Sequence, residues 1–305
     1  MITMSNSGQY KKPRLTMEQR QSLTGWLFLL PGSVLIIWMS FYPMVRAFMV
    51  SLMRGKPTAL QFSDPLWRNY QYMFKDKVFL TSLKNTFTYL IIQVPVMLVL
   101  ALIFASLLNQ KDLKFKGLFR TCIFLPCATA LVSYSIVFRT LFAYDGFINA
   151  VLVKAHLLSE PVNWLNDPTG AKAVIILALI WRWTGYNMVF YLSSMQSIDY
   201  SIYEAARIDG ASPFTQLTKI TMPLLKPIIL VTAIMYTNGT LQLYDESVAL
   251  TNGGPANASI TMSHYIYNTT FVTSPNFGYA AAMSFLILIM VAILSAIQMK
   301  VGDKR

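Results

Sequence analysis

The chain has 305 residues, of which 55% are apolar and only 12% are charged. Soluble domains carry about 25% charged residues, so this composition excludes an ordinary soluble protein and indicates a membrane protein built from helices. The formal net charge of +12 is explained by basic residues that flank membrane spans, and no nucleic-acid partner is needed to account for it.

Charge-free stretches locate the expected membrane-spanning helices. A helix needs about 20 apolar residues to cross a bilayer, and uncharged runs such as 23–45 and 85–110 reach that length. The sequence therefore predicts an all-α fold with a tail over residues 1–23, one transmembrane domain over 24–300 and a short tail over 301–305. The six predicted spans lie near residues 24–45, 86–109, 119–141, 173–193, 226–247 and 277–299.

The distribution of basic residues predicts how the chain crosses the membrane. With the N-terminus inside, the cytoplasmic segments hold 14 lysines and arginines and the outer segments hold 8. Because cytoplasmic loops are enriched in these residues, both termini and the loop at 196–225 are predicted to be cytoplasmic. The first span is interpreted as an uncleaved anchor, because no cleavage-type site precedes it.

The sequence shows no motif for catalysis or for binding ATP. It contains no GxxxxGK[ST] phosphate loop, and its two histidines, His156 and His264, lack the paired spacing of a metal site. Cys122 and Cys127 are interpreted as small packing residues of an apolar helix. The remaining classes are transport and signalling, with energy supplied by another chain.

The most distinctive segment lies between the fourth and fifth predicted spans. It reads Glu-Ala-Ala-Arg-Ile-Asp-Gly at 204–210, followed by Ile-Thr-Met-Pro at 220–223. The Glu-Ala-Ala triplet favours a helix with a very small face, which Asp199 can cap. Gly210 suits a turn or a close backbone approach, and Pro223 is tolerated in the first turn of the next helix. A short exposed helix of this kind suits docking into a cleft of another protein.

Further motifs follow one another along the chain. Phe-Arg-Thr at 119–121 and Leu-Pro at 125–126 open the third span, and Asp-Gly-Phe-Ile-Asn stands at 145–149. Trp-Arg-Trp-Thr-Gly-Tyr-Asn occupies 181–187 in the fourth span, and residues 244–255, ending in Leu-Thr-Asn-Gly-Gly-Pro, close the fifth. Over about residues 24–300, this series resembles the permeases of binding-protein-dependent ABC importers for carbohydrates. It looks most like the subunit that corresponds to the larger maltose permease, with Met222 and Asp199 as departures from the usual motif.

The resemblance implies a type I ABC importer permease fold with a cytoplasmic EAA coupling helix. It implies a multi-pass protein of the bacterial inner membrane that is not itself an enzyme and holds no cofactor, because Mg-ATP binds to partner subunits. The implied partners are a second homologous permease subunit, two ATP-binding subunits (or a homodimer of them), an extracytoplasmic solute-binding protein and a sugar. The residues expected to couple the chain to the ATPases are Glu204, Ala205, Ala206, Asp209, Gly210, Ile220 and Pro223.

A sugar-binding site is predicted on the fourth and fifth spans. Aromatic faces can stack on the C–H surface of a sugar ring, and amide or hydroxyl groups can bond its hydroxyls. Trp181, Trp183, Tyr186 and Asn187 supply such groups in the fourth span, whereas Tyr236, Thr240, Leu243 and Tyr244 have the spacing of one helical face. The resemblance maps the sugar-contacting positions onto Trp181, Arg182, Trp183, Tyr186, Tyr236, Gly239, Thr240 and Leu243. For each aromatic residue, helix packing or interfacial anchoring is the alternative.

Arg182 is the most informative single residue, because a charge deep in a span is costly and marks a functional hypothesis. It could pair with Asp245 or Glu246, face a wet cavity, or meet an anionic substrate. A di- or oligosaccharide is the expected substrate, and glycerol phosphate or a related polyol is the alternative. An ion-coupled secondary transporter is a further alternative, but it would need acidic residues deep in its spans.

Overall fold

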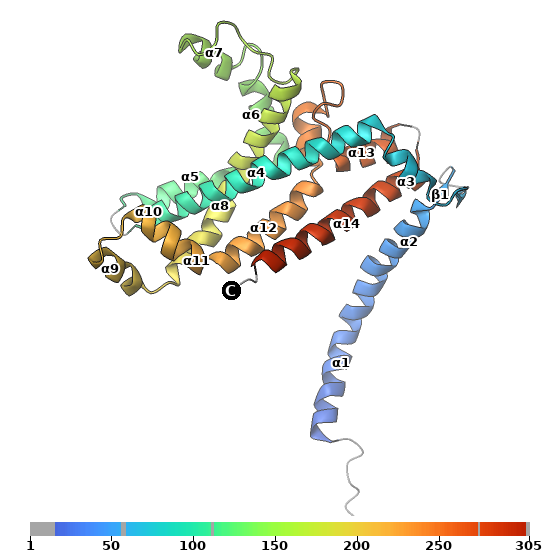
Figure 1. Cartoon of the computed structure of the whole chain (residues 1–305), viewed down its shortest axis with the longest axis horizontal. Helices are drawn as coiled ribbons and strands as arrows, with labels where there is room; N and C mark the ends of the chain where they lie inside the picture. The colour runs from blue at the N-terminus through green and yellow to red at the C-terminus, as the bar shows by residue number, and fades with distance from the viewer. Residues whose placement is uncertain (1–15, 56–58, 111–112, 274, 303–305) are drawn as a thin grey trace, which may run out of the picture. The chain divides into compact units, whose positions relative to one another are not determined.

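The computed structural model describes residues 16–55, 59–110, 113–273 and 275–302, and most of these are helical (Figure 1). The chain divides into two compact units, Met1–Met49 and Val50–Arg305. The first unit is part of a helical segment that ends just beyond the boundary, at Ser51. The second unit holds the elements that form the candidate site.

The N-terminal segment is one apolar candidate span of 35 residues, Met17–Ser51. It comprises α1 (Met17–Ile36), a π-helical turn η1 (Ile37–Phe41) and α2 (Tyr42–Ser51). Thr16 and Gln19 form a reciprocal capping box at its start, which satisfies two backbone donors of the first turn. The helix therefore begins at Met17, inside the predicted tail, while residues 1–15 of that tail lie outside the described residues.

The remaining elements follow in chain order. A two-stranded antiparallel sheet pairs Met53 with Phe62, and the rest is helical. The elements are β1 (Met53–Arg54), β2 (Gln61–Phe62), α3 (Arg68–Met73), α4 (Lys77–Asn109), α5 (Lys116–Ala128), α6 (Leu131–Leu141), α7 (Phe147–Lys154), α8 (Pro168–Gln196), α9 (Tyr200–Ile208), α10 (Pro213–Gln216), η2 (Leu217–Thr221), α11 (Met222–Leu224), α12 (Lys226–Leu241), η3 (Ser247–Thr251), α13 (Met262–Tyr267), η4 (Asn268–Val272) and α14 (Phe277–Gly302).

Two of the long helices begin earlier than the uncharged runs suggest, because aspartates cap them. Asp76 Oδ1 accepts hydrogen bonds from the backbone N–H groups of Val78 and Phe79 at the start of α4. Asp167 Oδ2 does the same for Thr169 and Gly170 at the start of α8. Side-chain oxygens at this position satisfy otherwise unpaired N–H groups. The helices therefore extend into charged flanks that a search for charge-free runs leaves out.

The third predicted span is bent, and a second bend lies just before the fifth. The axes of α5 and α6 differ by 100°, and the axis of α12 differs by 74° from that of the segment Pro213–Leu224. Between α5 and α6, Thr129 and Ala130 adopt extended backbone conformations, which interrupt the ladder of helical hydrogen bonds. Among the described residues, four helices are long and apolar enough to cross a membrane by themselves, and counting each bent pair as one span gives up to six. The predicted all-α membrane fold is confirmed.

The second unit is held together by the packing of α8 against its neighbours. In Figure 1, α4 lies along α8 and α12, α5 contacts α8, and α14 contacts α12. A hydrogen bond of 2.8 Å between the Tyr191 and Thr232 hydroxyls joins α8 to α12. The cluster between α4 and the C-terminal half of α8 includes Ala101, Leu102, Ala105, Met188, Tyr191 and Leu192. This packing fixes the two helices that carry the candidate site.

Asp76 also joins three elements that are distant in sequence. Its Oδ2 accepts hydrogen bonds from Tyr265 of α13 (2.5 Å) and Tyr279 of α14 (2.7 Å), while Oδ1 caps α4. Burial raises the pKa of Asp76, but the bonds from Tyr265, Tyr279 and the backbone N–H groups outweigh it and hold the pKa below its ordinary value. The ionised carboxylate therefore stabilises the fold.

We expect Asp76→Asn to lower the free energy of unfolding by about 1.5–3 kcal/mol, since hydrogen bonds to a charged group contribute that much. A carboxyl group with a lowered folded-state pKa stabilises the protein above its unfolded pKa and loses that contribution as the pH falls through the folded value. The stability gap between wild type and variant should therefore close below about pH 4. Thermal unfolding of the purified protein in detergent measures it, with Asp145→Asn at an exposed position as the control. A gap that persists unchanged at pH 3 contradicts this role.

Candidate functional site

A cavity of about 590 Å³ lies between α8, α12 and the segment that follows α12. Eight of the ten predicted substrate-binding residues line it, and the structure adds six others. The predicted residues are Arg182, Trp183, Tyr186, Tyr236, Gly239, Thr240, Leu243 and Tyr244. The additional ones are Gln93, Leu179, Met235, Gln242, Asp245 and Glu246. The fourth and fifth predicted spans therefore line one cavity, and contact of these residues with a substrate stays a prediction.

Three aromatic rings form one wall of the cavity. The ring of Trp183 lies 6.1 Å from that of Tyr186 and 5.9 Å from that of Tyr236, centroid to centroid, in edge-to-face arrangements. Aromatic pairs of this geometry hold each other in place. The rings give the cavity a rigid, largely apolar surface of the kind that small-molecule sites combine with a few placed polar groups.

Gln93 of α4 contributes a polar group that the sequence analysis did not single out. Its Oε1 accepts a hydrogen bond from the Thr240 hydroxyl at 3.1 Å, and its Nε2 contacts Met97 Sδ at 3.4 Å. An amide in the middle of the uncharged run 85–110 is the signal that could have identified it, because polar groups within spans are costly unless paired.

Arg182 is engaged in a buried ion pair at the edge of this cavity. Its Nη1 lies 3.1 Å from Glu246 Oε1 and donates to the Tyr134 hydroxyl at 3.2 Å, and that hydroxyl donates to the same carboxylate oxygen at 3.0 Å. The guanidinium lies 4.9 Å from the ring centroids of both Tyr134 and Trp183, a cation–π distance. Of the alternatives open from the sequence, the structure shows pairing with Glu246 in a side chain that also lines the cavity, and contact with an anionic substrate stays a hypothesis.

Two predicted residues do not line the cavity. Trp181 is 43% exposed and packs against Tyr134 and Phe138. Asn187 is fully buried, and its Nδ2 donates to the Trp183 carbonyl at 3.0 Å. Both have packing or helix-internal roles in this conformation, and their contact with substrate stays a prediction.

Leu243 and Tyr244 reach the cavity by a different route from the one predicted. The helix α12 ends at Leu241, so these residues do not continue one helical face with Tyr236 and Thr240. The segment after α12 is held instead by hydrogen bonds from Thr261 to the Leu243 carbonyl and from Tyr89 and Asn85 of α4 to Ser259 and Ile260. These bonds bring the acidic residues that follow α12 to the cavity.

The Gly-Gly-Pro segment after η3 forms a compact turn. Gly253 has φ of +76°, and a Cβ there would lie 3.2 Å from His264 Cε1 and 3.3 Å from Ile260 Cβ. The Ser247 hydroxyl lies 3.0 Å from His264 Nδ1, and burial lowers the pKa of His264. Within the described ranges there is no group of three or more histidine, cysteine or acidic side chains that could hold a metal ion. His264 is buried and its ring packs edge-to-face against that of Tyr244.

The predicted coupling helix is α9, and the local sequence accounts for both of its ends. Asp199 caps it by accepting from the Ser201 N–H at 2.9 Å, as predicted, and the hydrogen bonds from Ser201 lower the pKa of Asp199. At the other end, Ala211 N–H bonds the Ala206 carbonyl and Gly210 N–H bonds the Arg207 carbonyl. This is a Schellman motif, which needs a left-handed residue, and Gly210 supplies it with φ of +77°.

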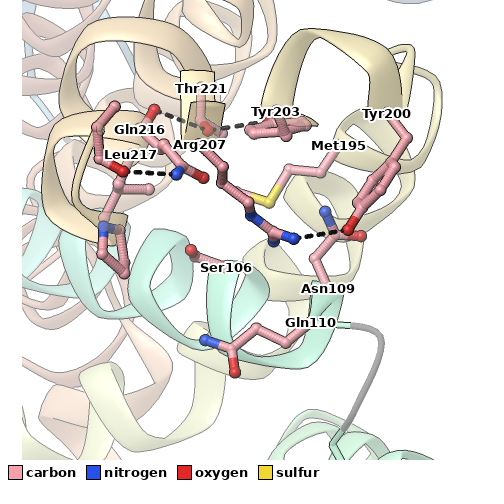
Figure 2. A pocket seen from close by; sticks show the side chains of 12 residues that line it. Ser106, Asn109, Gln110, Met195, Tyr200, Tyr203, Arg207, Gln216, Leu217 and Thr221 are labelled. Atoms are coloured by element: carbon pink, nitrogen blue, oxygen red, sulfur yellow. Dashed lines mark hydrogen bonds between the residues drawn. The ribbon is translucent and has the colours of Figure 1, made fainter. Parts of the chain in front are cut away.

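One side of α9 contacts the bundle and the other is exposed. The Tyr203 hydroxyl lies 3.0 Å from that of Thr221 in η2, and Arg207 Nη1 donates to the Tyr200 hydroxyl at 2.8 Å (Figure 2). These residues line a cavity of about 450 Å³ that also includes Ser106, Asn109 and Gln110 at the end of α4. Of the predicted coupling residues, Glu204, Ala205, Asp209, Gly210 and Pro223 are exposed, and Ala206 and Ile220 are half-buried.

Large apolar side chains are exposed beside these small residues. Ile208, within the motif, is 86% exposed, and Phe214 of α10 is 74% exposed. Exposed apolar groups next to a helix with small side chains are typical of a surface that another protein covers. Neither was singled out from the sequence, where a single isoleucine or phenylalanine carries no such signal.

Comparisons with known proteins agree with this architecture. A model of the family described as binding-protein-dependent transport system inner membrane component matches residues 74–303. The chain is 46% identical over 294 residues to the lactose transport system permease protein LacF of Rhizobium radiobacter, covering 96% of this chain and 98% of that protein. It is 30% identical to the trehalose/maltose transport system permease protein MalF of Thermococcus litoralis, covering 95% and 97% of the two chains.

Among solved structures, a chain of a bacterial ABC transporter involved in the import of the acidic polysaccharide alginate has the same fold. Its TM-score is 0.80 at 20% identity, and the match covers 94% of this chain and 97% of that one. At this identity the likeness concerns the fold alone. Together with the family match and the full-length relatives, it leads to one conclusion: the chain belongs to the family of inner membrane components of binding-protein-dependent transport systems.

Proposed function

We propose that this chain is a permease subunit of an ATP-driven importer that moves a sugar, a di- or oligosaccharide, from a solute-binding protein into the cytoplasm. The relatives named for lactose and for trehalose/maltose support a sugar of this size. The aromatic wall of the cavity supports it independently, because its rings can stack on sugar rings. The chain itself catalyses no reaction in this proposal, and ATP is hydrolysed by partner subunits.

The observation that carries the proposal is the connection between the cavity and α9. The helix α8 ends at Gln196, the exposed α9 follows at Tyr200, and α12 begins at Lys226. The loop 196–225 thus directly joins the two helices that supply most of the cavity wall. A partner that moves α9 would move α8 and α12 with it, since short connections join α9 to both helices and the Tyr203 hydroxyl lies 3.0 Å from that of Thr221 in η2. Rigid-body rocking of this kind is an established form of switching.

The partners and the orientation are part of the proposal. A solute-binding protein is supported by a solved structure of an alginate ABC transporter in complex with a periplasmic protein, which matches this fold with a TM-score of 0.79. The excess of 14 basic residues over 8 supports cytoplasmic termini and a cytoplasmic α9. A second permease subunit and two ATPases complete the assembly.

The test uses cross-linking from α9 in the assembled transporter. Ala205→Cys, in a chain with Cys122→Ser and Cys127→Ser, is expected to cross-link to the ATP-hydrolysing subunit, because Ala205 lies on the exposed side of α9. Lys154→Cys in α7, on the predicted outer side, is the matched control and should give no such product. Sugar uptake should also stop when the ATPase is inactivated. An Ala205→Cys chain that never captures the ATPase, or uptake that continues without ATP hydrolysis, contradicts the proposal.

A further inference from the structure

The charges that line the cavity are unbalanced. Among its lining residues, Arg182 is the basic one, and Asp245 and Glu246 are the acidic ones. One positive and two negative side chains give the wall a formal charge of −1. In a site partly shielded from water, an uncompensated charge strongly affects which ligands can enter.

The positive charge of Arg182 is already paired with a carboxylate. Its charge is matched by Glu246 at 3.1 Å, and its side chain is only 17% exposed. The rings of Tyr134 and Trp183 cover the guanidinium at 4.9 Å each. A phosphate or carboxylate of a substrate would therefore share with Glu246 a positive charge that is already paired, so the net charge of the wall would still oppose its binding.

Asp245 is more exposed than Glu246, the acid that follows it. It is exposed where it lines the cavity, and in the part of the chain that the structure describes no lysine, arginine or histidine forms a salt bridge with it. Its negative charge therefore adds to the potential of the cavity without a paired cation beside it. The adjacent aromatic faces reinforce this, since the face of an aromatic ring is electron-rich and attracts cations.

We infer that the cavity selects uncharged sugars and that Asp245 is the residue that excludes anionic ones, such as uronates, sugar phosphates and glycerol phosphate. This inference rests on the proposed function in sugar import. Arg182 accordingly has a structural role in the cavity wall, and the hypothesis that it meets an anionic substrate is not favoured by the geometry.

The first arm of the test measures the potential in the cavity without any sugar. Met235 lines the cavity and is 54% exposed, so Met235→Cys, with Cys122→Ser and Cys127→Ser, places one thiol there in the assembled transporter. The measured quantity is the ratio of the reaction rates of a cationic and an anionic methanethiosulfonate. This ratio should be about tenfold higher for the cavity thiol than for a free thiol in solution, because the site is near a unit negative charge. Adding Asp245→Asn should lower this preference by about threefold or more, whereas Asp145→Asn should leave it unchanged.

The second arm measures selectivity. The probes are lactitol and lactobionate, two disaccharide derivatives in which one of the two sugar units is opened. Lactitol has a hydroxymethyl group at the position where lactobionate has a carboxylate. Their equilibrium binding to the purified assembled transporter is compared without the solute-binding protein. Wild type should bind lactitol about tenfold more tightly than lactobionate, and Asp245→Asn should narrow the difference several-fold.

The outcomes separate this inference from the proposed function. Two outcomes overturn the role of Asp245 while leaving sugar import intact. One is equal normalised reaction of the two thiol reagents in the Met235→Cys chain that keeps Asp245, and the other is an unchanged ratio of lactitol to lactobionate binding in Asp245→Asn. Failure of intact cells to take up any neutral disaccharide through the complete importer overturns the proposed function itself. The inference is supported if Asp245→Asn lowers both the preference for the cationic reagent and the preference for lactitol, while Asp145→Asn changes neither.

Discussion

Arg182→Gln is expected to abolish sugar uptake and to destabilise the protein by about 3–5 kcal/mol, the usual cost of removing one partner of a buried ion pair. Glu246 is only 6% exposed, so loss of the guanidinium leaves a largely buried carboxylate without its counter-charge. The Tyr134 hydroxyl would remain as its donor, but one neutral hydrogen bond does not offset a buried charge.

The double variant Arg182→Gln with Glu246→Gln provides the decisive comparison. Because two amides can hydrogen-bond to each other without an uncompensated charge, the double variant should be more stable than either single variant. A double-mutant cycle on thermal unfolding in detergent measures this coupling. Additive effects of the two changes would show that the pair does not act as a unit. In the double variant Asp245 still carries its charge, so the discrimination against anionic sugars should persist.

The same residues show why the sequence alone could not determine which acid pairs with Arg182. Asp245 and Glu246 are adjacent, and helical spacing would choose between them only if the fifth span continued as a helix. In the structure α12 ends at Leu241. Contacts from α4 and from Thr261 then hold the following segment so that Glu246 is the acid that pairs with Arg182. Those contacts involve residues 85–89 and 259–261, so they depend on tertiary structure that local periodicity does not encode.

The spans themselves were far more predictable. A charge within a bilayer is costly, so uncharged runs of a membrane protein mark its helices. Each predicted span overlaps helical segments of the structure, although the fifth was placed to residue 247 and α12 ends at Leu241. The helix ends were less predictable, because capping by Asp76 and Asp167 extends α4 and α8 into their charged flanks. The bend of 100° at residues 129–130 was missed, since neither Thr129 nor Ala130 differs in type from residues within a straight span.

The motif at 204–210 was predictable because its structure depends on residues that are close together in the sequence. Its features are local: a side-chain cap at Asp199, helix-favouring alanines and a left-handed Gly210 after the last turn. Each follows from the preferences of the residues concerned. Neighbouring elements decide how α9 is anchored, and the contact between Tyr203 and Thr221 could not be read from the sequence.

Gly185→Ala is the second substitution with a large expected effect, and it acts through helix packing. A Cβ at Gly185 of α8 would lie 1.9 Å from the Ile123 carbonyl oxygen and 2.9 Å from Phe124 Cα in α5. These are backbone atoms, so no side chain can rotate away, and the two helices must separate. Small residues allow such close approach between membrane helices. We expect a loss of about 3 kcal/mol or more, at the upper end of the range for an overpacked core.

Separation of α5 from α8 would also move the cavity wall, because Arg182, Trp183 and Tyr186 lie within one turn of Gly185. Uptake should therefore fall together with the thermal unfolding midpoint. Gly239→Ala is the matched control: no atom lies within 4 Å of the added Cβ, and alanine favours a helix interior over glycine by about 0.5–1 kcal/mol. It should thus stabilise the protein slightly although it lies on the cavity wall. Stability changes of the same sign and size in both variants would mean that backbone contact between α5 and α8 does not set the position of the aromatic wall.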